Sequence, residues 1–101
     1  MVTVGLLLRI EAEPDKADEV EAMLAAAVNH VRHETATVVW FAFRLGPTTF
    51  GVFDASVDEA NRQAHLDANM GALRGELAAR LFAESPSVEK VDVIAAKIPG
   101  M

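Results

Sequence analysis

The chain has 101 residues, of which 51% are hydrophobic and 24% are charged, and its formal net charge is −6 at pH 7. A chain of this length makes one domain, so we take residues 1–101 as a single unit. The acidic balance argues against nucleic acid and membrane partners, because phosphate backbones and anionic membranes are bound by basic surfaces. The absence of cysteine excludes disulfides, thiolate nucleophiles and cysteine-ligated metals.

The N-terminal residues do not have the pattern of a signal peptide or of a membrane anchor. Residues 1–10 contain an apolar run, but they lack the basic start and the small-residue cleavage site of a signal peptide. The run is also too short to span a membrane. We therefore expect a cytoplasmic protein.

The first half of the chain predicts a strand, a helix and a second strand. Residues 2–11 are nearly continuous in apolar side chains, which is typical of a strand covered on both faces. A helix then opens at Pro14 with Asp15 as its cap, and apolar residues recur at helical spacing over residues 17–31. Residues 37–45 predict the second strand, because they are rich in β-branched and aromatic side chains on both faces.

The second half begins with a turn and ends with a strand. Gly46 and Pro47 predict the turn, so residues 49–55 are expected to return as an antiparallel strand. Residues 88–97 form the last predicted strand, after a helix that Ser85-Pro86 brings to an end. The chain therefore contains four predicted strands.

A long helix is predicted between the third and fourth strands. Ser56 followed by Glu59 has the pattern of a capping box at its start. Glycine is unfavourable in a helix by about 1 kcal/mol relative to alanine, and two glycines predict a break near residues 69–71. The expected core stripe of this helix is Leu66, Met70, Leu73, Leu77 and Leu81.

The element order β-α-β-β-α-β predicts an α+β fold, the ferredoxin-like split β-α-β arrangement with a four-stranded antiparallel sheet. Two helices cover only one face of such a sheet, yet the first two strands are apolar on both faces. A second copy of the same sheet is the simplest cover for the other face. We therefore expect a homodimer with sheets packed face to face, a dimeric α/β barrel.

Known sequence motifs for catalysis are absent from the chain, including Gly-rich phosphate loops, nucleophile elbows and zinc-binding HExxH helices. His30 and His33 lie three residues apart in the last turn of the first helix, where a cation complements the helix dipole. Two solvent-exposed histidines do not complete a metal ligand set. We expect no metal site.

His65 is the candidate for proton transfer. With 100° per residue it lies about 100° from the centre of the predicted core stripe, with Asn69 about 60° and Arg62 about 40° from it. Asn61, His65 and Asn69 follow one another at four-residue spacing on this flank. An imidazole beside an amide is suited to move a proton near neutral pH. The alternative is a half-buried structural histidine that bonds a backbone carbonyl.

Two residues of the second strand are candidates for substrate binding. Trp40 is the single tryptophan, and it either packs in the core or forms the aromatic wall of a flat apolar pocket. Arg44 lies on the same strand face. It either meets an acidic group of a substrate or pairs with a surface carboxylate.

The residues from Trp40 to Asp54 (WFAFRLGPTTFGVFD), together with Asp58-Glu59-Ala60 and Gln63-Ala64-His65-Leu66, resemble the antibiotic biosynthesis monooxygenase-like domain family. Its members are also described as candidate quinol monooxygenases, and the resemblance extends over essentially the whole chain. Glu34 fits the acidic residue that commonly precedes the second strand of this family, and His65 fits the histidine of its second helix.

This resemblance implies a dimeric ferredoxin-like barrel with an apolar pocket between the sheet and the helices of each subunit. Characterised relatives oxidise electron-rich phenols, anthrones or quinols with O2 and use no flavin, haem or metal. The implied function is therefore a cofactor-independent monooxygenase that acts on a quinol-like or polyketide-like aromatic substrate. His65 and Asn61 would handle the proton, and Trp40, Asn69 and Arg44 would contact the substrate.

Three departures from relatives and two alternatives accompany this expectation. Tyrosine, which some relatives use near the substrate, is absent. Leu8 and Ser56 occupy the places where haem-degrading relatives carry asparagine and tryptophan, so haem degradation is not expected. One alternative is a non-catalytic, small-molecule-binding or stress-associated dimer with a structural His65. The other is an isomerase-like activity on a small enol or lactone.

Overall fold

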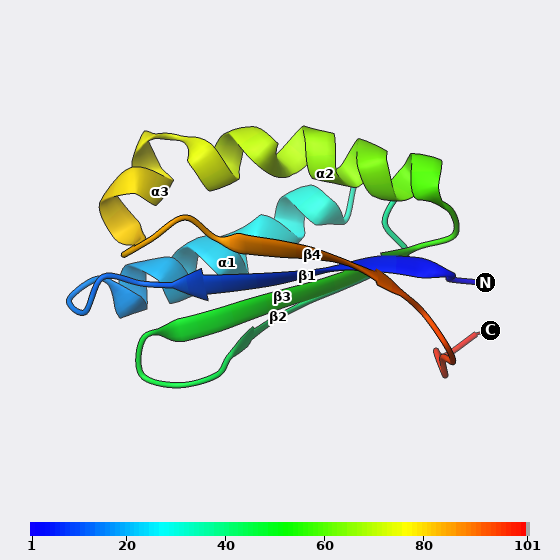
Figure 1. Cartoon of the computed structure of the whole chain (residues 1–101), viewed down its shortest axis with the longest axis horizontal. Helices are drawn as coiled ribbons and strands as arrows, with labels where there is room; N and C mark the ends of the chain where they lie inside the picture. Colours follow the sequence, from blue (N-terminus) through cyan, green and yellow to red (C-terminus); the bar gives the residue numbers. More distant parts are fainter. Residues whose placement is uncertain (101) are drawn as a thin grey trace.

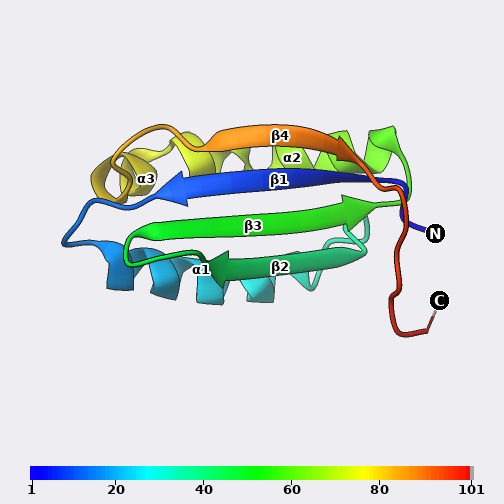
Figure 2. The same ribbon diagram turned by 60° about the horizontal axis from the view of Figure 1, so that its bottom comes forward.

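The computed structural model describes residues 1–100 as one four-stranded antiparallel sheet covered by three helices (Figure 1). The strands are β1 (Val4–Glu11), β2 (Val39–Arg44), β3 (Thr49–Ser56) and β4 (Ser87–Asp92), and they lie in the order β2-β3-β1-β4. The helices are α1 (Ala17–Val31), α2 (Glu59–Arg74) and α3 (Glu76–Leu81). All three lie on one face of the sheet (Figure 2). The predicted ferredoxin-like α+β fold is confirmed.

The strand register decides which side chains face the helices. Leu6 of β1 is opposite Asp54 of β3, and Trp40 of β2 is opposite Asp54 from the other side. Because side chains alternate along a strand, these three residues point to the same face of the sheet. This is the helix-covered face, since Leu6 and Asp54 are both buried.

The hydrophobic core fills one end of the space between this face and the helices. Phe50 and Ile10 from the central strands and Val20 from α1 are its most deeply buried members. Each such side chain stabilises the fold by about 1.5–3 kcal/mol relative to an exposed position. The remaining buried members are Ala12, Ala17, Leu24, Val52, Ala78, Leu81 and Phe82.

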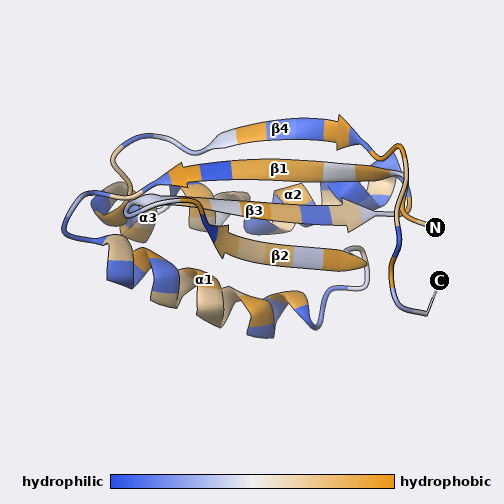
Figure 3. Cartoon of the chain, turned by 90° about the horizontal axis from the view of Figure 1, so that it is seen from below, coloured by the Kyte–Doolittle hydropathy of each residue, from blue (hydrophilic) through white to orange (hydrophobic). Residues whose placement is uncertain are grey.

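The opposite face of the sheet has no helix on it (Figure 3). Large apolar side chains of β1 and β2 are exposed there. Leu7 of β1 and Phe41 and Phe43 of β2 are 37%, 60% and 37% exposed. The ring of Phe43 lies over Gly51, where an added Cβ would be 2.3 Å from a ring carbon. We call the surface formed by Leu7, Phe41, Phe43 and Phe53 the outer apolar face.

Two predicted helix caps are wrong. Asp15 does not cap α1, because Lys16 holds the cap position and makes no side-chain capping bond. Ser56 does not cap α2, because it still belongs to β3, opposite Val4 in the sheet. Asp58 is the cap instead, and its carboxylate accepts a hydrogen bond from the backbone N–H of Asn61 at 2.9 Å.

Two further predicted boundaries differ from the structure by more than two residues. The helical break lies at Gly75, between α2 and α3, rather than near residues 69–71. The last strand ends at Asp92 rather than at residue 97, because its pairing with β1 ends opposite Val4. A single further backbone bond, from the Val93 N–H to the Thr3 carbonyl at 2.9 Å, closes that ladder.

The two buried side chains of α2 are polar, so the predicted core stripe is only partly correct. The buried side chains of α2 are Arg62 and His65, and Leu77 is 46% exposed at the start of α3. Arg62 reaches over the sheet and donates to the carbonyls of Gly5 at 3.2 Å and Val91 at 3.0 Å. Hydrogen bonds of this kind offset the cost of burying the guanidinium group.

We expect Gly5→Ala to destabilise the protein by about 1–3 kcal/mol, because the new Cβ would lie 2.6 Å from the backbone oxygen of Asp54. Gly71→Ala is the matched control. An added Cβ at Gly71 meets nothing within 4 Å, and alanine favours the helix by about 1 kcal/mol. Urea unfolding measures both values. Equal stabilities for the two variants would contradict this packing at Gly5.

Candidate active site

His65 lies between two carboxylates inside the protein. Its Nε2 atom is 3.1 Å from Oδ2 of Asp54, and its Nδ1 atom contacts Oε2 of Glu34. The side chains of His65, Asp54 and Glu34 are 4%, 6% and 14% exposed. Both ring nitrogens donate when the imidazole is protonated, so this arrangement suits an imidazolium. His65 bonds carboxylates and not the backbone carbonyl of the alternative interpretation. We call these three residues the acid–histidine chain.

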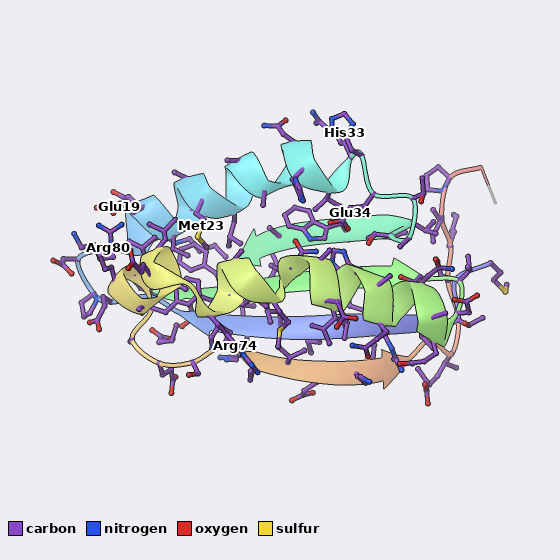
Figure 4. The ribbon with its side chains drawn as sticks, turned by 90° about the horizontal axis from the view of Figure 1, so that it is seen from above. Glu19, Met23, His33, Glu34, Arg74 and Arg80 are labelled. Atoms are coloured by element: carbon purple, nitrogen blue, oxygen red, sulfur yellow. The ribbon has the colours of Figure 1, made fainter. Side chains whose placement is uncertain are left out.

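Each member of this chain is held by a different element. Asp54 stands on the inner face of β3, a central strand of the sheet, and His65 faces it from α2. Glu34 belongs to the segment between α1 and β2, where its N–H donates to the carbonyl of Val31 at 2.9 Å. Figure 4 shows Glu34 between α1 and α2, whereas His33 projects away from the other side of α1.

Further hydrogen bonds orient the Glu34 carboxylate. Asn69 Nδ2 donates to Glu34 Oε1 at 3.1 Å and to the backbone oxygen of His65 at 2.7 Å. The hydroxyl of Thr37 donates to Glu34 Oε2 at 3.1 Å. Glu34 accepts hydrogen bonds from three side chains, and these fix its position. It is nevertheless the most exposed of the three residues of the acid–histidine chain.

The surroundings favour the charged forms of His65 and Glu34. Burial lowers the pKa of His65, but the hydrogen bond and charge of Asp54, followed by those of Glu34, raise it above the ordinary 6.5. Burial likewise raises the pKa of Glu34, and this effect is outweighed by the hydrogen bonds it accepts and by the His65 charge. The net result is a Glu34 pKa below 4.5.

A cavity of about 120 Å³ adjoins the acid–histidine chain. Asp54, His65 and Asn69 supply its polar lining. The other lining residues are apolar: Leu6, Leu8, Ile10, Met23, Leu24, Ala27, Trp40, Val52, Leu66, Ala72, Leu73 and Val88. Oδ1 of Asp54 is buried and accepts no hydrogen bond from residues 1–100. A buried oxygen of this kind lacks a donor, so the cavity is suited to a ligand that carries a hydroxyl group.

The structure brings together three of the five site residues predicted from the sequence. His65, Asn69 and Trp40 all line the cavity. Asn61 does not reach it, because its amide donates to Asp58 at 3.0 Å at the start of α2. The amide beside His65 is therefore Asn69, one turn after His65, and not the predicted Asn61.

Arg44 lies at the far end of β2 and does not line the cavity. Its guanidinium group pairs with Glu21 at 3.1 Å, donates to the carbonyl of Pro47 at 2.6 Å, and lies 5.0 Å from the ring centre of Phe50. Of the two roles considered for Arg44, the structure supports pairing with a surface carboxylate. The predicted contact with substrate is corrected accordingly.

Asp54 lines the cavity and pairs with His65, and it was not among the site residues predicted from the sequence. The signal was present in the strand pattern, because Phe50, Val52 and Asp54 alternate with the outward-facing residues and share one face. A carboxylate on an otherwise apolar strand face calls for a buried partner. That partner, His65, could not be identified without knowing how α2 is rotated on the sheet.

Residues 1–100 contain no group of three or more His, Asp or Glu side chains that could hold a metal ion. His30 and His33, the pair considered from the sequence, are both exposed. Within the same residues, no helix has both the length and the apolar character needed to cross a membrane.

The chain is similar to several solved structures. A protein of unknown function from Nitrosomonas europaea is 42% identical over 100% of this chain and 98% of its own, with a TM-score of 0.89. A candidate antibiotic biosynthesis monooxygenase from the same organism is 13% identical over 91% of this chain and 90% of its own, with a TM-score of 0.77. An antibiotic biosynthesis monooxygenase is 16% identical over 91% of this chain and 99% of its own, with a TM-score of 0.74. Neither a protein-family model nor a curated protein matches the sequence.

We expect His65 to titrate above pH 6.5 in NMR spectra of the imidazole protons, and Asp54→Asn to bring that pKa down. Because the folded-state pKa is raised, the stabilisation is fully present below the ordinary pKa and is lost as pH rises through the folded-state pKa. The stability difference between wild type and His65→Gln is therefore expected to shrink toward alkaline pH in urea unfolding. A His65 pKa at or below 6.5 would contradict this arrangement of charges.

Proposed function

Because the chain belongs to the antibiotic biosynthesis monooxygenase-like family, we propose that it oxidises an electron-rich hydroxyaromatic compound with O2 and without a cofactor. The observation that carries this proposal is the unpartnered Oδ1 atom of Asp54, buried in the lining of an apolar cavity and backed by His65. A carboxylate in this position can accept a proton from a substrate bound in the cavity.

The first proposed step is proton removal. Oδ1 of Asp54 accepts the acidic proton of the substrate, and the substrate becomes an aromatic enolate. His65 stays an imidazolium between Asp54 and Glu34 during this step, and its Nε2 proton remains hydrogen-bonded to Oδ2 of Asp54. Asp54 holds the substrate proton until the second step.

The second proposed step is oxidation by O2. The enolate donates one electron to O2, and the two radicals combine to form a carbon–oxygen bond. The resulting peroxide anion takes the proton back from Asp54 and becomes a hydroperoxide. The hydroperoxide loses water and leaves a carbonyl, so one oxygen atom enters the product and the other becomes water. For an anthrone, the CH2 carbon is oxidised to the second carbonyl of an anthraquinone. Apolar walls assist by keeping bulk water from the reactive anion.

We further propose that two copies of the chain associate through the outer apolar face. Phe41 and Phe43 expose large aromatic surface there, and no helix of the same chain covers it. Neighbouring exposed apolar side chains of this kind favour an association site. A second copy offers the same face and so allows a symmetric contact. The cavity lies on the other side of the sheet and stays outside this contact.

One observation favours a second candidate function. The cavity volume of about 120 Å³ is below the roughly 300–1000 Å³ of most ligand pockets. A small enol or lactone would therefore fit it, and the same Asp54 and His65 would move a proton between two carbons or oxygens of that ligand. No oxygen from O2 would enter the product of such an isomerisation.

We expect anthrone, mixed with the protein without oxygen and then exposed to 18O2, to yield anthraquinone that carries one labelled oxygen. Asp54→Asn and His65→Gln are expected to lower kcat/KM by about a hundredfold or more, the usual contribution of a positioned acid–base group. Mass spectrometry measures the 18O content of the anthraquinone, and absorbance measures the rate at which it forms.

His33→Gln is the matched control, because His33 is exposed and points away from the cavity. It is expected to keep the wild-type rate. Equal rates for wild type and His65→Gln would contradict the proposed proton transfer, and an unlabelled product would favour the isomerase. Circular dichroism confirms that each variant is folded before its rate is compared. A binding protein with a structural histidine would show no turnover above the uncatalysed rate.

The proposed association predicts a dimer at micromolar concentration in analytical ultracentrifugation. Phe41→Asp is expected to shift it to monomer, because a charge buried in an apolar interface has no partner. Leu77→Asp is the matched control, since Leu77 is also an exposed large apolar residue but lies on the helical side. A monomeric wild type would refute the dimer and leave the chemistry of the cavity untouched.

A further inference from the structure

We propose that the binding site has a second, outer half in the groove beside the α2–α3 break, which takes the apolar remainder of a substrate whose hydroxyaromatic end enters the cavity. This inference rests on the proposed function of the cavity. Two residues, Leu73 and Val88, line both the cavity and the groove. They therefore form the wall between the two spaces, with Leu73 on α2 and Val88 on β4.

The sizes of the two spaces are complementary. The cavity alone, at about 120 Å³, is too small for a typical organic ligand, whereas the groove has a volume of about 520 Å³. Ligand pockets commonly measure roughly 300–1000 Å³. A molecule that extends from Asp54 past Leu73 would use both spaces, and its volume would fall in the ordinary range.

The position of the groove follows from the helical break at Gly75. α2 ends at Arg74, and α3 begins again at Glu76 in a new direction, so that Ala78 and Ala79 face the groove with small side chains. A continuous helix with larger residues at these positions would fill this space. The wall of the groove thus consists mostly of short or apolar side chains.

The charges of the groove determine the chemical class of the ligand. Arg74, which lies on the β4 side of α2 in Figure 4, and Glu84 both line the groove, so it contains one group of each sign. A charged substituent would meet a like charge as well as an opposite one. The apolar lining residues are Met70, Leu73, Ala78, Ala79, Phe82, Pro86 and Val88. We therefore assign the groove to an uncharged alkyl or aryl extension of the substrate.

Trp40 allows a direct test with the full-length protein. It is the single tryptophan, tyrosine is absent, and it lines the cavity, so its fluorescence reports binding there. The probes are phenol and 4-hexylphenol, titrated under identical conditions. We expect 4-hexylphenol to bind at least tenfold more tightly than phenol, since each fully buried methylene contributes about a factor of four.

Ala79→Phe is the decisive variant, because it places a large ring in the groove from an exposed helical position. We expect it to leave the dissociation constant of phenol unchanged and to reduce the advantage of 4-hexylphenol to less than threefold. Leu77→Phe is the matched control on the same short helix. Leu77 does not line the groove, so this variant is expected to keep the full advantage of the longer probe.

The outcomes separate the two proposals. If phenol quenches Trp40 but the hexyl chain adds nothing, or if Ala79→Phe leaves the advantage intact, the outer half of the site is refuted and the cavity stands. If neither probe changes the fluorescence, the cavity does not bind a hydroxyaromatic group, and both proposals fall.

Discussion

Asp54 occupies the inner face of a central strand, and this placement constrains the rest of the helical layer. β3 lies between β1 and β2, so a side chain in its middle cannot reach water over an edge of the sheet. An isolated carboxylate there would cost several kcal/mol. The imidazole of His65 pairs with this carboxylate, with Nε2 at 3.1 Å from Oδ2 of Asp54. Glu34 pairs with the other ring nitrogen of His65. The position of α2 over the sheet follows from this pairing.

Arg62, one turn before His65, anchors the same helix by a second polar contact. Its guanidinium group donates to backbone carbonyls of β1 and β4, while His65 bonds β3. Hydrogen bonds are directional, so together these two residues fix both the rotation and the lengthwise position of α2. An apolar stripe in their place would tolerate sliding. The predicted apolar stripe does not continue in one line through Leu77, because the helix breaks at Gly75 and Leu77 belongs to α3.

The fold could be predicted from the sequence, because strand and helix periodicities depend on near neighbours in the chain. The order of the elements and the uncovered second face of the sheet both follow from such patterns. The helix caps were harder to predict from the sequence. Ser56 has a suitable side chain for a cap, but its pairing with Val4 makes it the last residue of β3. The rotation of α2 could not be predicted either, because it depends on contacts with Asp54 and Gly5. These two residues belong to strands that are distant from α2 in the sequence.

The net charge of the acid–histidine chain affects both substrate binding and product release. Two carboxylates and one imidazolium leave one net negative charge beside the cavity, and the free Oδ1 of Asp54 needs a donor. A neutral substrate with a hydroxyl group supplies that donor, whereas an anion is repelled. When Asp54 takes the proton, the negative charge passes to the substrate, where O2 can react with it. A quinone product has carbonyl acceptors and no hydroxyl donor, so it leaves Oδ1 unsatisfied again. The group that binds the substrate therefore also disfavours retention of the product.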